Sequence, residues 1–289
     1  MTSAQTNYYY MKKFGPALSF IALVSICISA PLHSATAEIG LSADEARQIA
    51  LLPPKGKDAA DLEIVHWQAR LAEKPSYSPY WERLGWAYIA KARLTQDAGY
   101  YKLAQLTISA WVAQCGPSLE AKLLEGHVDH NLHQFKTAET IARSLIAQRQ
   151  NPADYALLSD ALMEQGTLDE AVRACQTLSN LRPGVEAFTR IAHLRLLYGD
   201  LDGAIQAMDA AIRAGDPRDY ESRAWMYSRL AGYQLLKNDA SMALAFANKA
   251  LDGAPDHPLA LAIKGRALYS IGKYDEALAA LKRAAEFNP

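Results

Sequence analysis

Residues 155–183 read YALLSDALMEQGTLDEAVRACQTLSNLRP and contain every signal of one complete structural unit. Apolar residues recur at helical spacing in two runs, residues 158–162 and 168–178, which predicts two amphipathic helices. Gly166 lies between the runs, where a glycine in the left-handed conformation ends a helix, and Thr167 follows as a candidate N-cap. Pro183 ends the second run because proline cannot continue a helix. The stretch therefore predicts a helix-turn-helix hairpin.

The same hairpin recurs along the chain. Five pairs of small residues, each pair 12 residues apart, are Gly126 and Ala138, Ser159 and Ala171, Ala192 and Ala204, Ala231 and Ala243, and Gly265 and Ala277. Small residues suit a crossing of two helices whose axes lie about 8–10 Å apart. The successive alanines are 33, 33, 39 and 34 residues apart, and the value of 39 predicts a longer loop at residues 216–220. One hairpin leaves an apolar face uncovered, so the pattern predicts a stack.

The repeated unit resembles the tetratricopeptide repeat (TPR). The residues in that motif's positions are Tyr155, Leu158, Ser159, Leu162, Ala171 and Pro183, and in an earlier hairpin Trp81, Leu84, Gly85, Tyr88, Tyr101, Ala104 and Pro117. Gly85 and Ala104 are 19 residues apart, which predicts a longer first hairpin. The resemblance implies an all-α, right-handed solenoid of about six repeats over residues 77–289. The expected repeats are residues 78–117, 119–152, 152–184, 185–218, 224–257 and 258–289.

The first 37 residues are typical of a secretory signal peptide. Lys12 and Lys13 precede an apolar run over residues 17–30, and small residues end at Ala37, the predicted cleavage position. That run is shorter than the roughly 20 residues that span a bilayer, so no stable membrane span is expected after cleavage. The sequence thus predicts an exported bacterial protein, periplasmic or secreted.

Residues 38–76 are predicted to form an N-terminal helical cap and linker. Ser42 and Glu45 have the spacing of a capping box. A second helix is expected over residues 61–73, and its expected packing face consists of Leu62, Val65, Ala69 and Ala72. At the other end no helix follows residues 261–289, so Leu278 and Leu281 are expected to be exposed. Either the protein self-associates through this C-terminal face, or the natural chain continues past Pro289. Cys115 and Cys175 are expected to remain unpaired.

Composition excludes some classes of function. The chain has 289 residues, 50% hydrophobic content and a net charge of −1, which suits a globular protein and offers no electrostatic basis for binding nucleic acid. Neither a Gly-x-Ser-x-Gly motif, nor a phosphate-binding glycine loop, nor a Cys-x-x-Cys motif is present. Asp169 and Glu170 lie where a helix begins, as dipole-stabilising residues do. No enzymatic activity and no cofactor are therefore predicted.

The resemblance also implies where a partner would bind. TPR arrays line a concave groove with their first helices, and the residue after each small position points into it. The candidate peptide-groove residues are Trp86, His127, His130, Asp160, Met163, His193, Trp225, Arg266 and Tyr269. They predict a scaffold in the cell envelope that binds an unidentified protein, as an extended peptide or a partner helix.

Three groove positions on consecutive first helices carry chemically interesting side chains. His127, Asp160 and His193 occupy equivalent places, and His130 lies one turn from His127. One interpretation is a hydrogen-bonded row that orients side chains of the groove. The alternative is a metal-binding or metal-delivery protein, because imidazoles with a carboxylate suit transition metals. Spacing alone leaves both open.

Overall fold

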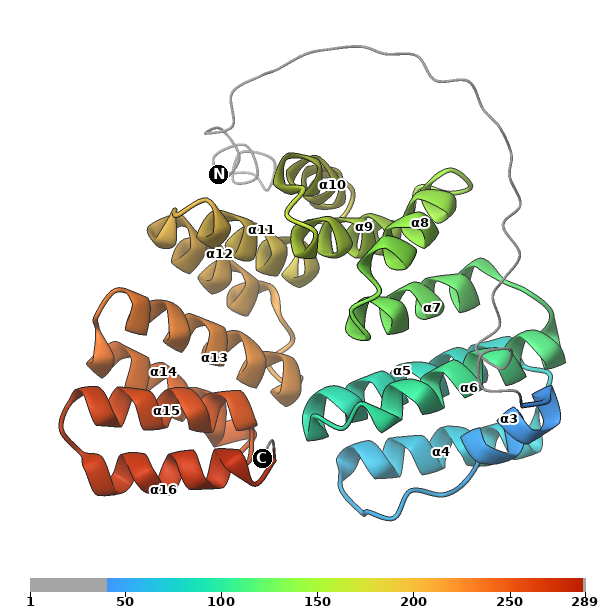
Figure 1. The fold of residues 1–289 in the computed structure, drawn as a ribbon, viewed down its shortest axis with the longest axis horizontal. Coiled ribbons are helices and arrows are strands. Elements are labelled where there is room, and N and C mark those ends of the chain that lie inside the picture. Colours follow the sequence, from blue (N-terminus) through green and yellow to red (C-terminus); the bar gives the residue numbers. More distant parts are fainter. Residues whose placement is uncertain (1–40, 288–289) are drawn as a thin grey trace, which may run out of the picture. The chain divides into compact units, whose positions relative to one another are not determined.

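The structure is a computed structural model that describes residues 41–287. These residues form fourteen α-helices and no strand, as Figure 1 shows. They divide into two compact units, one comprising the described residues up to Lys91 together with Ala98–Val128, the other Ala92–Asp97 and the described residues from Asp129 onward. None of these helices combines the length and the apolar character needed to cross a bilayer. The predicted signal peptide lies outside the described residues.

The first unit contains the N-terminal helices and the first long hairpin. Its helices are α3 (Ala43–Ala50), α4 (Ala59–Glu73), most of α5 (Ser78–Thr95), α6 (Gly99–Cys115) and most of α7 (Leu119–Asn131). The expected capping box begins α3, because Ser42 and Glu45 bond reciprocally. The expected length of the first hairpin is also present, with 18 residues in α5 and 17 in α6. Trp81 and Trp111 fill its core.

The packing face expected for α4 is wrong. Leu62 is 62% exposed and Val65 43% exposed, whereas Asp61, Ile64 and Leu71 are buried. The buried face also carries Gln68, whose side-chain amide donates to the carbonyl oxygens of residues 50 and 52 and to the hydroxyl of residue 88. The helix has apolar residues on two faces, and its polar contacts select the one that packs.

The second unit is a series of antiparallel helix pairs. Its helices are α8 (Phe135–Ile146), α9 (Pro152–Glu164), α10 (Leu168–Leu181), α11 (Val185–Leu197), α12 (Leu201–Ala214), α13 (Tyr220–Leu236), α14 (Ala240–Gly253), α15 (Pro258–Ser270) and α16 (Tyr274–Ala285). Gly166 has the expected left-handed conformation, with φ of 73°. Thr167 is the N-cap of α10 by position, but its side chain makes no capping hydrogen bond.

The small residues lie at helix crossings, as the spacing predicts. Ser159 and Ala171 are fully buried, and the Ser159 hydroxyl donates to the Ala171 carbonyl oxygen across 3.2 Å. At Gly265 an added Cβ would lie only 2.5 Å from Cγ of Leu281. Larger side chains at these crossings would push the paired helices apart.

The longer spacing before Ala243 is only partly a longer loop. Helix α13 has 17 residues, whereas α9 and α11 have 13 each. Most of the six additional residues therefore extend the first helix of that hairpin. This extension adds residues 220–223 to the start of α13, and Tyr220 among them is 62% exposed.

The cysteines and the C-terminal helix agree with expectation. Cys115 and Cys175 are free, and burial raises the pKa of the Cys175 thiol to about 12, so this side chain is an inert part of the core. Leu278 is 53% exposed and Leu281 is exposed as well. Helix α16 therefore exposes two leucine side chains.

We predict that His257 makes the stability of the last hairpin sensitive to pH. His257 is the N-cap of α15, and its Nδ1 accepts a hydrogen bond from the Ala260 amide across 3.3 Å, which requires a neutral ring. Burial lowers the pKa of His257, so the unfolded chain, with a histidine pKa of about 6.5, takes up a proton before the folded chain does. Stability is complete above about pH 6.5 and decreases as the pH falls from there toward the folded pKa.

Amide hydrogen exchange of α15 between pH 5 and pH 8 measures this effect. His257→Asn preserves the cap and should remove the pH dependence, whereas His257→Ala should cost about 1 kcal/mol at neutral pH. An unchanged pH profile in His257→Asn would contradict the prediction.

Candidate functional site

The first helices of the hairpins form one side of the second unit. Helix α9 contacts α11 and α13 contacts α15, whereas among α8, α10, α12, α14 and α16 no two helices contact each other to a comparable extent. First helices are therefore neighbours within the pairs α9–α11 and α13–α15, whereas α11 and α13 have at most a weak contact. We call the exposed surface of α9, α11, α13 and α15 the inner-helix surface.

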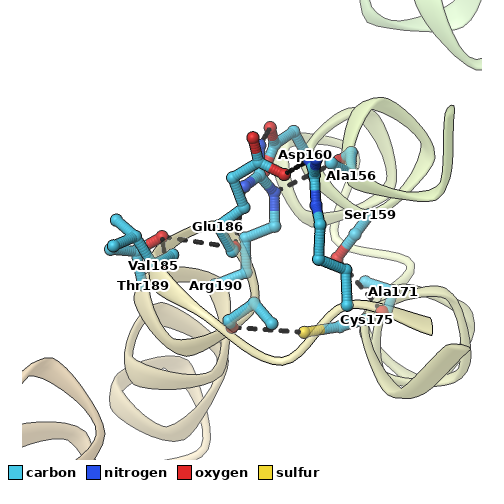
Figure 2. A network of polar contacts seen from close by, with 11 residues as sticks. Ala156, Ser159, Asp160, Ala171, Cys175, Val185, Glu186, Thr189 and Arg190 are labelled. Carbon is cyan, nitrogen blue, oxygen red and sulfur yellow. Dashed lines mark hydrogen bonds and ion pairs between the residues drawn. The ribbon is translucent and has the colours of Figure 1, made fainter. Parts of the chain in front are cut away.

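An ion pair joins α9 to α11 on this surface. Nη2 of Arg190 lies 2.5 Å from Oδ2 of Asp160, and Figure 2 shows how the arginine reaches from one helix to the other. Its Nε donates to the carbonyl oxygen of Ala156 across 3.3 Å, and Nη1 donates to that of Glu186 across 2.8 Å. The side chains of Arg190 and Asp160 are only 16% and 21% exposed.

Asp160 stabilises the charged form of Arg190. Burial would lower the pKa of Arg190, but the charge of Asp160 and the hydrogen bond to it outweigh burial and raise that pKa. The pair is therefore a fixed, internally neutralised link between adjacent hairpins. The sequence pattern placed Asp160 in a row of histidines, and Arg190 was missed entirely.

Two histidines lie near this pair without a hydrogen bond to it. Burial lowers the pKa of His130, while the charges of Asp160 and Glu164 oppose that shift. Nε2 of His130 is buried and has no hydrogen-bond partner among the described residues. Burial also lowers the pKa of His193, the positive charge of Arg229 lowers it further, and Glu164 and Asp160 oppose both. The neutral form of both imidazole rings is therefore favoured.

Helix α13 presents an arginine between two aromatic rings. The guanidinium carbon of Arg229 lies 5.9 Å from the ring centre of Trp225 and 5.8 Å from that of Tyr233. Trp225 is 40% exposed, whereas Tyr233 is buried. Stacking of this kind orients an arginine without neutralising it.

The other predicted groove residues lie in different surroundings. On α15, Arg266 is exposed and Tyr269 is 65% exposed, with the ring centre of Tyr269 lying 5.4 Å from that of Tyr274. Met163 is buried within α9 and offers little surface. In the first unit the rings of Trp86 and His127 meet edge to face, with centres 4.9 Å apart.

The geometry adds no support to the metal alternative. Within residues 41–287, no three His, Cys, Asp or Glu side chains gather in an arrangement that could hold a metal ion. Oδ2 of Asp160 accepts a hydrogen bond from Nη2 of Arg190. The alternative set of His127, His130, Asp160 and His193 stays a prediction from spacing.

Comparisons with known proteins identify the kind of fold. The family model described as anaphase-promoting complex, cyclosome, subunit 3 matches residues 197–284. The chain is similar to one in the structure of the APC/C hetero-tetramer Cut9–Hcn1, with a TM-score of 0.61 and 16% identity over 86% of this chain and 50% of that chain.

A second solved structure is similar over nearly its whole length. This is TTC0263, a thermophilic TPR protein in Thermus thermophilus, with a TM-score of 0.55 and 20% identity over 67% of this chain and 98% of that chain. A search of curated proteins gives no significant match. At identities this low, the structural likeness establishes the fold.

Proposed function

Because the chain is a tetratricopeptide-repeat solenoid, we propose that it is a non-enzymatic scaffold that binds another protein on the inner-helix surface. The observation that carries the proposal is the exposure of Trp225, Arg266 and Tyr269 on the first helices α13 and α15. Tryptophan, tyrosine and arginine are the residues that most often dominate the energy of protein interfaces. The occupant is an extended peptide or a partner helix, the two shapes that a helical groove accepts.

The cell envelope is the proposed location of this scaffold. The support is the sequence of residues 1–37, with its two lysines, its apolar run and its small residues before the predicted cleavage position. A protein exported in this way meets partners in the periplasm or outside the cell. Its partner would then be an envelope or secreted protein.

The test compares two double variants in affinity capture from the envelope fraction of the native host, followed by measurement of the dissociation constant for the captured protein. The first, Trp225→Ala with Tyr269→Ala, removes two exposed aromatic rings from the inner-helix surface. The matched control, Leu181→Ala with Met242→Ala, removes two exposed apolar side chains from the second helices α10 and α14.

We expect the first variant to bind at least about 30-fold more weakly, since each central aromatic residue of an interface contributes about 1–2 kcal/mol. The control should bind like the unaltered protein. Equal affinities for the two variants would place the binding surface elsewhere.

A further inference from the structure

The ion pair between α9 and α11 defines two positions of the repeat. Asp160 directly follows the small residue Ser159 on its first helix, and Arg190 lies two residues before the small residue Ala192 on the next first helix. Their side chains meet across the two helices. Thus one first helix supplies the carboxylate, and the next first helix supplies the arginine whose charge this carboxylate neutralises.

The same two positions occur one repeat later with a different pair. His193 directly follows Ala192, and Arg229 lies two residues before the small residue Ala231. Besides burial, the positive charge of Arg229 lowers the pKa of His193, and the two residues hold the repeat positions that Arg190 and Asp160 hold in the preceding pair of first helices. In this repeat, however, the imidazole of His193 occupies the position that the carboxylate of Asp160 occupies in the preceding repeat.

This substitution leaves Arg229 without a counter-charge. Across residues 41–287, no carboxylate forms an ion pair with it. The acidic groups that act on the neighbouring His193 are Glu164 and Asp160 on α9, and Asp160 is neutralised by Arg190. Arg229 is half-buried and oriented by the rings of Trp225 and Tyr233. An arginine that is held in place and has no ion pair can bind a planar anion.

We propose that Arg229 binds a side-chain carboxylate of the protein partner, which takes the place that Asp160 has beside Arg190. The inference rests on the proposed function, because it names the chemistry by which the inner-helix surface recognises its partner. Trp225 would contact the apolar part of the same segment, and a ring N–H of His193 would donate to the second carboxylate oxygen. The partner segment therefore contains an aspartate or glutamate at the point that crosses α13.

A small probe tests the site by itself. The histidines of the full chain are followed by NMR during pH titration, with and without N-acetylglutamate N-methylamide, and the glutamine analogue serves as the neutral probe. We expect the acidic probe alone to raise the pKa of His193, because an anion at Arg229 favours the imidazolium. Arg229→Gln should abolish that response, Arg229→Lys should preserve part of it, and Arg173→Gln, on the exposed face of α10, should leave it unchanged. An equal response in Arg229→Gln would overturn the inference.

A second arm connects the site to the binding surface. Linear peptides with blocked termini are selected on the unaltered protein from a random library, so that any carboxylate comes from a side chain. The selected peptides should contain an aspartate or glutamate whose replacement by the amide weakens binding about tenfold, and Arg229→Gln should remove that difference. Glu164→Gln, which removes a nearby negative charge, should strengthen binding of the acidic peptides.

The two arms separate the two claims. If the selected peptides bind equally well with the acidic residue and with its amide, the carboxylate site is refuted and the proposed scaffold function is unaffected. If the acidic probe raises the pKa of His193 but no peptide is selected, the result supports the anion site and contradicts peptide binding.

Discussion

Replacing Asp160 by alanine will lower the free energy of unfolding of the second unit by about 3 kcal/mol. The substitution leaves the guanidinium of Arg190 between α9 and α11 without its counter-charge, and that side chain is only 16% exposed. An unpaired buried charge costs far more than the pair itself contributes. Urea denaturation followed by circular dichroism measures the loss, and amide hydrogen exchange should locate it in α9 and α11.

The chain offers a matched control for this effect. Asp209 pairs with Arg213 within α12, but the two side chains are 50% and 63% exposed. Asp209→Ala should therefore change stability by no more than about 0.5 kcal/mol. The double variant Asp160→Leu with Arg190→Met, which removes both charges, should recover most of the loss. If Asp160→Ala and Asp209→Ala were equally mild, the link between the hairpins would be a surface contact.

Much of the fold is predictable because helix crossings constrain residue size locally. Ser159 and Gly265 are small for reasons that the structure makes visible, namely a bond to the facing helix and contact with Leu281. Gly166 ends a helix in the conformation that glycine permits. Each of these signals depends on residues within one hairpin, so periodicity is enough to find them.

Positions that depend on distant partners were harder to predict. Leu62 and Val65 match a packing face by spacing, yet α4 packs through Asp61, whose partner Lys91 lies thirty residues away. Arg190 was missed for the same reason, because an isolated arginine on an amphipathic helix is usually solvated. Aligning the repeats on their small residues would have placed Arg190 and Arg229 at equivalent positions and revealed the exchange of Asp160 for histidine.

The second large effect concerns a buried lysine in the first unit. Nζ of Lys91 lies 2.5 Å from Oδ2 of Asp58 and 3.0 Å from Oδ1 of Asp61, and the side chains of Lys91 and Asp61 are 5% and 2% exposed. The two aspartates also form the capping box that begins α4. Lys91 thus attaches the start of α4 to α5.

Lys91→Met should destabilise the first unit by about 3–5 kcal/mol at neutral pH, because Asp61 would remain buried without its cation. Burial would raise the pKa of Asp58, but the hydrogen bonds from Lys91 and from the Asp61 backbone outweigh it and lower that pKa. This contribution is complete above the unfolded pKa of about 3.9 and disappears as the pH falls through the folded pKa. The difference between the variant and the unaltered protein should therefore shrink below about pH 4.

Two measurements at pH 7 and pH 3.5, urea unfolding and amide hydrogen exchange in α4, distinguish this mechanism from a simple loss of packing. A loss of packing would not depend on pH. The matched control is Lys237→Met, since Lys237 pairs with Asp202 at the surface, where the side chains are 43% and 74% exposed. That control should change stability by no more than about 0.5 kcal/mol. A loss in Lys91→Met that stays the same at both pH values would mean that the aliphatic stem of the lysine holds α4 in place and the two aspartates do not.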